Sequence, residues 1–289
     1  MANILAVGIA TLDIINTVEQ FPHEDAEVRV LSQQQTRGGN ATNTLSVLSQ
    51  LGHSCSWAGV LINEPDSVVI KKALADHQID ISNCAELMHG KMPTSYITLN
   101  KQTGSRTNVH HRDCPEFTFS QFKKIDLKHY DWLHFEGRNI ADTMMMLEYC
   151  KHHYPHIPCS IEIEKPREGI EQLFPHADIL LFSKHYVESK GFNNPLTFLE
   201  SLSIPTIASC TWGEQGAWLK TKDNNIIHSP AFSPNQVVDT LGAGDTFNAG
   251  MIHSMCSNKN EHDALDYACK LAGHKCGQQG LTFSNLNFN

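Results

Sequence analysis

Short apolar runs alternate with segments of helical character between residues 132 and 209 of this 289-residue chain. The predicted strands are Trp132–Phe135, Ser160–Ile163, Asp178–Phe182 and Thr206–Ser209, and the predicted helices between them are Ala141–Lys151, Arg167–Phe174 and Pro195–Leu202. Strands that alternate with helices form βαβ units, whose parallel strands make a sheet covered by helices on both faces. The sequence therefore predicts a three-layer α/β/α domain with a mainly parallel central sheet.

The two ends of the chain extend this pattern. We expect strands at Asn3–Gly8 and Cys55–Val60, a hairpin of Trp218–Thr221 with Ile226–Ser229, and helices at Ala41–Leu51, Asp66–His77, Ala243–Met255 and Glu261–Gly277. Gly52 is the expected stop of the first of these helices, because glycine readily ends a helix. The chain shows no internal repeat and no low-complexity linker that would divide it.

Three polar segments of β character do not fit the alternation. They are Val28–Gln33, Ser95–Leu99 and Thr107–His110, the last two joined by a predicted turn at Lys101–Gly104. Alternating polar and apolar residues with a turn between them are typical of exposed antiparallel strands. We interpret them as a small accessory β-sheet that acts as a lid on the main domain.

Charge and cysteine content exclude several classes of protein. The formal net charge is −9, and no basic face is visible, which argues against binding to nucleic acid. The first basic residue is Arg29 and no apolar run approaches about 18 residues, so we predict neither a signal peptide nor a membrane span. Nine cysteines without a C-x-x-C pair favour reduced thiols and a cytoplasmic location. The Cys and His residues between 150 and 159 favour a solvated loop over a metal site, because two prolines interrupt them.

The strongest local signal is the segment from Asp239 to Asp245, which precedes a predicted helix and contains two glycines. Backbone amides at Gly242, Ala243 and Gly244, together with the helix N-terminus, make a cradle for an anion. The segment is neither a Walker loop nor a dinucleotide fingerprint, since it lacks the lysine of the first and the third glycine of the second. Asp245 fits a base that takes a proton from an attacking hydroxyl, or alternatively a carboxylate that stabilises its helix dipole.

A second glycine pair lies in Arg37-Gly38-Gly39-Asn40, three residues before Asn43. Amide side chains donate and accept hydrogen bonds, as sugar hydroxyls require, although Asn40 also fits a helix cap. Asp13 follows the first strand at the edge where α/β sheets bind ligands, and it also fits a turn.

Together these motifs resemble the ribokinase-like (phosphofructokinase-B type) carbohydrate kinases, and the match narrows to the ketohexokinase group of that family. The motifs that carry the likeness are Asp13, Glu24-Asp25, Ser32-Gln33, Arg37–Asn40, Glu136–Asn139, Glu162–Glu168, Val237–Ala249 and Lys275–Gly280. The resemblance implies one domain over residues 1–289, with lid strands from about 13–36 and 93–112. It also implies transfer of the γ-phosphoryl group of ATP to a ketose, with D-fructose giving fructose 1-phosphate as the leading reaction.

The resemblance further implies roles for particular residues. Asp245 would be the base, and Gly242, Ala243 and Gly244 would form the anion hole. The implied sugar contacts are Asp13, Gly38, Gly39, Asn40 and Asn43, and the implied nucleotide contacts are Arg106, Trp212, Gly213, Glu214, Gly216, Gly242, Gly244 and Cys276. Arg106 would stabilise charge on the transferring phosphoryl group. ATP and Mg²⁺ are the implied cofactors, K⁺ is a further candidate ion, and the lid would join two copies in a homodimer.

The sequence departs from the family pattern at Phe182–Tyr186, which lacks the Asn and Glu that often organise Mg²⁺, so no metal residue is assigned. Ser105 and Glu64-Pro65-Asp66 also differ from the expected pattern and leave the sugar preference open. Alternatives are a kinase for ribose, another ketose, a glycated sugar or a nucleoside, and a catalytically silent sugar sensor. A silent protein would have no need of Asp245.

Overall fold

A computed structural model describes residues 1–286, so the last three residues of the predicted domain lie outside the described part. Its main sheet has the strand order β14-β13-β12-β11-β10-β9-β1-β4. These strands are β1 (Asn3–Val7), β4 (Ser54–Ala58), β9 (Trp132–Glu136), β10 (Cys159–Ile163), β11 (Ile179–Phe182), β12 (Ile207–Thr211), β13 (Ala217–Lys220) and β14 (Ile226–Ser229). All neighbours are parallel except β12–β13 and β13–β14, which are antiparallel. The predicted mainly parallel sheet and the terminal hairpin are confirmed.

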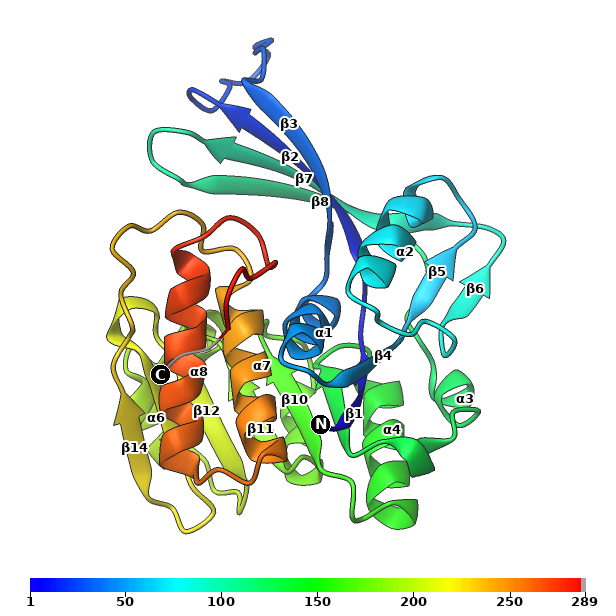
Figure 1. The fold of residues 1–289 in the computed structure, drawn as a ribbon, viewed down its shortest axis with the longest axis vertical. Coiled ribbons are helices and arrows are strands. Elements are labelled where there is room, and N and C mark those ends of the chain that lie inside the picture. Colours follow the sequence, from blue (N-terminus) through cyan, green and yellow to red (C-terminus); the bar gives the residue numbers. More distant parts are fainter. Residues whose placement is uncertain (287–289) are drawn as a thin grey trace.

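Helices cover both faces of this sheet. The chain moves from β9 to β12 in one direction across the sheet but from β1 to β4 in the other, so right-handed crossovers put the two sets of helices on opposite faces. One face carries α1 (Asn40–Gln50), α7 (Ala243–Cys256) and α8 (Glu261–Cys276), which lie side by side (Figure 1). The other carries α4 (Ile140–His153), α5 (Lys184–Ser189), α6 (Pro195–Ser201) and the 3₁₀ segment η2 (Ile170–His176).

A second sheet of four strands, in the order β3-β2-β7-β8, projects beyond the body of the molecule (Figure 1). Its strands are β2 (Thr11–Val18), β3 (Ser32–Gly38), β7 (Lys91–Asn100) and β8 (Arg106–Asp113). Close to it, α2 (Asp66–Asp76) and the short parallel pair β5 (Val60–Ile62) and β6 (Ala85–Leu87) complete this side of the molecule. The remaining short helical turns are α3 (Phe119–Phe122), η1 (Leu127–His129) and η3 (Gly213–Gln215).

Three predicted elements are wrong in position or type. The strand expected at Val28–Gln33 begins only at Ser32, because β3 is set by its antiparallel pairing with β2, from Thr17↔Ser32 to Thr11↔Gly38. The polar residues of β3 gave no local signal for this distant partner.

The helix expected at Arg167–Phe174 is instead the 3₁₀ segment η2, which follows Gly169 at φ 77° and contains Pro175. Proline lacks the amide that an α-helix would use, so the segment stays short. The strand expected at Cys55–Val60 ends at Ala58, and Val60 begins β5, which pairs with β6 instead.

Among residues 1–286, no helix is long and apolar enough to cross a membrane. Within the same residues, the structure brings no three Cys, His, Asp or Glu side chains into an arrangement that could hold a metal ion, so the 150–159 tract forms no such cluster. All nine cysteines are free thiols.

Candidate active site

The carboxylate of Asp245 lies in the first turn of α7, buried at the carboxyl edge of the main sheet. The helix begins after Gly242, whose φ of 79° is a left-handed conformation that glycine adopts without strain. The side-chain amide of Asn43, on α1, donates to Asp245 Oδ2 at 2.7 Å. Burial raises the pKa of Asp245 to about 7, the carboxylates of Glu164 and Glu136 add to the rise, and Asn43 opposes it. A carboxylate with this pKa can accept a proton near neutral pH.

Arg37 holds the start of α1, a role that the sequence motifs did not predict. Its fully buried guanidinium donates to the side chains of Thr42, Asn43 and Ser46, the last two at 3.0 and 2.8 Å. Burial lowers the pKa of Arg37 to about 10, and the charges of Asp245 and Asp13 oppose the decrease. Arg37 thereby fixes the oxygen of Asn43, so that the amide nitrogen of Asn43 points to Asp245. The only signal in the sequence was an arginine beside a glycine pair.

Asp13, on β2, is the second buried carboxylate of the site. Thr11 donates to its Oδ1 at 2.8 Å, and burial raises the pKa of Asp13 despite this bond. A Cβ on Gly38 would lie 2.2 Å from Asp13 Oδ2, and a Cβ on Gly39, at φ 106°, would lie 2.2 Å from the carbonyl oxygen of Ile9. Gly38 therefore lets β3 approach β2 at Asp13, and Gly39 lets the start of α1 approach the residues that precede β2.

Further carboxylates lie where β9 and β10 end. Glu136 Oε2 accepts from the backbone amide of Ile9 at 2.5 Å, Glu162 Oε1 accepts from Asn248 at 3.1 Å, and Glu164 accepts from Asn40 at 3.1 Å. Burial raises the pKa of Glu136 to about 7 and that of Glu162 above its usual range. Asn40 thus bonds Glu164 rather than capping its helix, since α1 has no side-chain cap.

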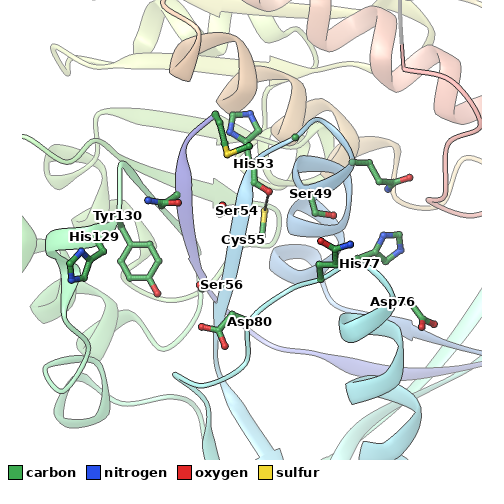
Figure 2. Close-up of a pocket in the computed structure, with 15 residues that line it drawn as sticks. Ser49, His53, Ser54, Cys55, Ser56, Asp76, His77, Asp80, His129 and Tyr130 are labelled. Carbon is green, nitrogen blue, oxygen red and sulfur yellow. Dashed lines mark hydrogen bonds between the residues drawn. The ribbon is translucent and has the colours of Figure 1, made fainter.

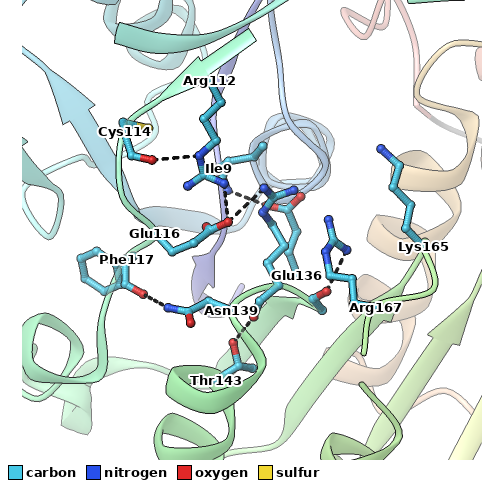
Figure 3. A network of polar contacts seen from close by, with 12 residues as sticks. Ile9, Arg112, Cys114, Glu116, Phe117, Glu136, Asn139, Thr143, Lys165 and Arg167 are labelled. Carbon is cyan, nitrogen blue, oxygen red and sulfur yellow. Dashed lines mark hydrogen bonds and ion pairs between the residues drawn. The ribbon is translucent and has the colours of Figure 1, made fainter. Parts of the chain in front are cut away.

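A basic network borders these carboxylates on the side of the small sheet. Figure 3 shows Arg112, from the end of β8, pointing to Glu116. Arg138, which follows β9, bonds the same Glu116 oxygen at 3.0 Å, and Arg167 donates to the carbonyl oxygen of Gly137 at 2.9 Å. The single carboxylate of Glu116 therefore pairs with two guanidinium groups beside the site.

A cavity of about 320 Å³ adjoins the N-terminus of α7. It is lined by Thr211, Gly213, Glu214, Gly216, Ala217, Ala231, Phe232, Ser233, Pro234, Val237, Thr240, Ala243, Gly244, Phe247, Cys269, Ala272, Gly273 and Cys276. Most of the residues expected to contact the nucleotide lie here, between η3, the 231–240 segment and α8. Trp212 and Gly242 do not line the cavity. Trp212 is buried, with the centroid of its ring 5.1 Å from Lys184 Nζ, and Gly242 lies against the side chain of Leu281.

Within residues 1–286, Arg106 makes no polar side-chain contact with the other residues predicted to form the site. It begins β8, opposite Leu99 of β7, and it is exposed. Its side chain makes no hydrogen bond or ion pair with any residue in the described range. The part of the sheet that carries it overhangs the N-terminal end of α7 and the C-terminal end of α8 (Figure 1).

A larger polar hollow of about 750 Å³ lies elsewhere, over the edge strand β4. Figure 2 shows His53, His77, Asp76 and Asp80 around it. None of its lining residues belongs to the predicted site, so it is separate from Asp245 and the smaller cavity.

A model of the pfkB family carbohydrate kinases matches residues 1–287. The chain belongs to the pfkB family of carbohydrate kinases. Ketohexokinase from Mus musculus is 38% identical over 289 residues, covering 96% of this chain and 97% of the mouse chain. Ribokinase from Bacillus subtilis (strain 168) is 24% identical over 277 residues, covering 94% of this chain and 92% of its own.

A solved structure described as a putative ribokinase from Agrobacterium tumefaciens superposes with a TM-score of 0.85 at 20% identity, covering 96% of this chain and 92% of that one. The family, the ribokinase-like α/β fold with its small separate sheet, and the activity of an ATP-dependent sugar kinase are thus confirmed. Kinases of this pfkB family use ATP and Mg²⁺.

Proposed function

We propose that this pfkB family kinase phosphorylates a ketose, with D-fructose as the leading substrate and fructose 1-phosphate as the product. The observation that carries the mechanism is Asp245, buried at the glycine-opened N-terminus of α7 and held by Asn43. The 38% identity to mouse ketohexokinase over nearly the whole chain supports the ketose as acceptor.

In the proposed reaction, Asp245 accepts the proton of a sugar hydroxyl as that oxygen attacks the γ-phosphorus of ATP. The new bond joins the sugar oxygen to phosphorus, the bond from phosphorus to the β–γ bridging oxygen breaks, and ADP leaves with that electron pair. Phosphoryl transfer depends mainly on positioning and on charge stabilisation. The amides of Gly242, Ala243 and Gly244 would supply that stabilisation with Arg106, while Asp13, Gly38, Gly39, Asn40 and Asn43 hold the sugar.

Adenine would occupy the 320 Å³ cavity, whose wall includes Gly213, Glu214, Gly216 and Cys276. Gly244 belongs to the same wall, so a nucleotide there would direct its phosphates toward the N-terminus of α7. Trp212 is buried and does not line this cavity, so it would not contact the base directly.

Mg²⁺ would neutralise charge on the phosphates when it is bound. The donor set fits such an ion, because Mg²⁺ keeps several waters and takes only one or two carboxylates. Oε2 of Glu162 is buried without a hydrogen-bond partner among the described residues, and Glu164 lies two residues further on. We assign these two carboxylates to the waters of Mg²⁺, and K⁺ remains a candidate ion without an assigned site.

We also propose that the small sheet is the lid and joins two copies of the chain. Ile14, Tyr96 and Val109 are aligned across β2, β7 and β8, and Tyr96 and Val109 are exposed. Adjacent positions Asp13 and Ser95 are buried, because successive side chains of a strand point to opposite faces. One face of the sheet therefore covers the site, while the other offers apolar side chains that a second copy would bury.

A cytoplasmic location stays a prediction.

The experiment that tests the function is a coupled assay of ADP release against ketoses, aldoses and nucleosides, with the position of the product phosphate determined by NMR. We expect the highest kcat/KM with D-fructose and phosphate on carbon 1. A higher kcat/KM for ribose or a nucleoside would replace the substrate in the proposal, and no turnover with any acceptor would favour the silent sugar sensor.

A further inference from the structure

Lys275, near the end of α8, is a charged residue with a wholly buried side chain. Its ammonium donates to Asp239 Oδ2 at 2.7 Å and to the backbone carbonyl oxygen of Asp239 at 2.8 Å. A buried ion pair loses the hydration of both groups, and apolar residues of similar volume often stabilise a fold as well or better. Packing of α8 therefore does not explain a lysine at this position.

Asp239 is the centre of a set of hydrogen bonds that join two segments. Its Oδ1 accepts from the amide of Leu241 at 2.9 Å, and its Oδ2 also accepts from the amide of Gly280 at 3.0 Å. The amides of Val238 and Asp239 donate to the carbonyl oxygen of Cys276 at 2.8 and 3.3 Å. These bonds fasten residues 238–241 to the C-terminal end of α8 and to the residues that follow it.

The fastened segment leads directly into the anion cradle. Only Thr240 and Leu241 separate Asp239 from Gly242, and the carbonyl oxygen of Thr240 accepts from the amide of Ala243 at 3.2 Å. The segment has little apolar burial of its own, since Val237 and Val238 are 62% and 48% exposed. Its backbone is therefore held by hydrogen bonds. Among the described residues, the ammonium of Lys275 is the only buried cation that takes part in these bonds.

We propose that Lys275 is a positioning residue that acts through Asp239 to fix the amides of Gly242–Gly244 for the transferring phosphoryl group. Lys275 does not line the nucleotide cavity, although its neighbour Cys276 does. The inference rests on the proposed function, because the aimed amides matter only if they bind a phosphoryl group. Asp239 compensates the positive charge of Lys275. The expected effect of Lys275 is therefore on the geometry of the amides and not a direct attraction of the phosphate.

The test compares Lys275→Met, which keeps the length of the side chain but removes its charge, with Lys270→Met. Lys270 lies on the same helix and makes an exposed ion pair with Asp266 at 2.8 Å, so it is a matched control. We expect Lys275→Met to lower kcat about 100-fold with KM for the sugar little changed, because small misplacements of catalytic groups have effects of this size. Lys270→Met should keep wild-type kinetics.

Two further variants separate positioning from general loss of structure. Asp239→Asn should lower kcat by a similar factor, and the double variant Asp239→Asn/Lys275→Met should lose little more than either single variant, because one interaction is removed in all three. In Lys275→Ala, added propylammonium, which matches the three carbons and the ammonium group removed, should restore part of the activity by occupying the vacated space. A wild-type kcat in folded Lys275→Met, or additive losses in the double variant, would overturn the proposal.

Amide hydrogen exchange gives a measurement that does not depend on activity. In Lys275→Met we expect faster exchange at residues 239–245, with the rest of α7 and the main sheet as protected as in the wild type. Faster exchange throughout the chain would assign Lys275 to global stability and overturn the proposal. If the wild type phosphorylates no acceptor, the proposed function fails, while unchanged exchange at 239–245 would by itself refute the positioning role.

Discussion

The floor of the candidate site, where the end of β3 meets α1 and α7, and the outer edge strand β8 of the small sheet differ in how their polar residues are held. On the floor, Asp245, Asn43 and Arg37 are buried and joined to one another through Asn43. Arg37 comes from the end of β3, at one edge of the small sheet. At the start of β8, on the opposite edge of that sheet, Arg106 is exposed and its side chain has no partner among the described residues. The floor is thus organised before any ligand binds, whereas we expect the arginine to gain its partners only when a ligand is bound. Substitutions in the two regions should separate stability from activity.

Asp245→Asn tests the floor most directly. Asparagine keeps the shape of the side chain but cannot accept the hydroxyl proton, so we expect kcat to fall about 10³- to 10⁴-fold. Calorimetry should show sugar binding within a few-fold of the wild type. Near-native turnover in this variant would remove Asp245 as the base.

Arg106→Ala tests the outer edge strand β8. Loss of a group that stabilises charge in the transition state should lower kcat/KM for ATP about 10²- to 10³-fold. Because Arg106 is exposed, the midpoint of thermal unfolding of the Arg106→Ala variant should match that of the wild type. Lys101→Ala is a control on the neighbouring turn, whose exposed ion pair with Glu19 contributes little. Equal kinetics in the two variants would end the distinction we draw.

Arg37→Met should show the opposite pattern. It removes three donors from buried acceptors, so the free energy of unfolding should fall by about 3 kcal/mol in urea titrations. Activity of the folded fraction should also decrease, since Asn43 loses the bond that orients it. An unchanged stability would contradict the view of the floor as a rigid unit.

The pH dependence of kcat/KM should report the buried base. Only the deprotonated form of Asp245 accepts a proton, so below its pKa of about 7 we expect kcat/KM to fall about tenfold per pH unit, with a plateau above. Asn43→Leu removes a group that lowers this pKa, so the midpoint should move to higher pH. A midpoint near pH 4 would show that burial does not control Asp245.

Stability should change with pH in the opposite sense. The folded pKa of Asp245, about 7, exceeds its ordinary value of 3.8, so the folded state binds more protons between pH 4 and 7. The contribution of this carboxyl group to the free energy of unfolding is therefore present at low pH and is lost as pH rises through 7. Asp245→Asn should flatten that loss in denaturant titrations across this range.

The main sheet could be predicted because its strands are local apolar runs, as at Ile179–Phe182, and the helices between them have their own pattern. The start of β3 could not be predicted in this way, because its polar residues adopt a strand only through pairing with β2. The helix expected at Arg167–Phe174 is wrong for a different reason: the segment forms the 3₁₀ turns of η2, which includes Pro175, a residue without the amide that an α-helix uses.

The sequence by itself determined which chemical groups the site has, since the glycines beside Asp245 and the Gly-Gly-Asn segment can be recognised without a structure. Only the tertiary structure decided how they act together. It joined Asn43 to Asp245 across 202 positions, gave Arg37 three buried acceptors, and set Lys275 against Asp239 across 36. These contacts depend on which helices pack together, and burial, which shifts the pKa of Asp245, is a property of the whole fold rather than of any segment.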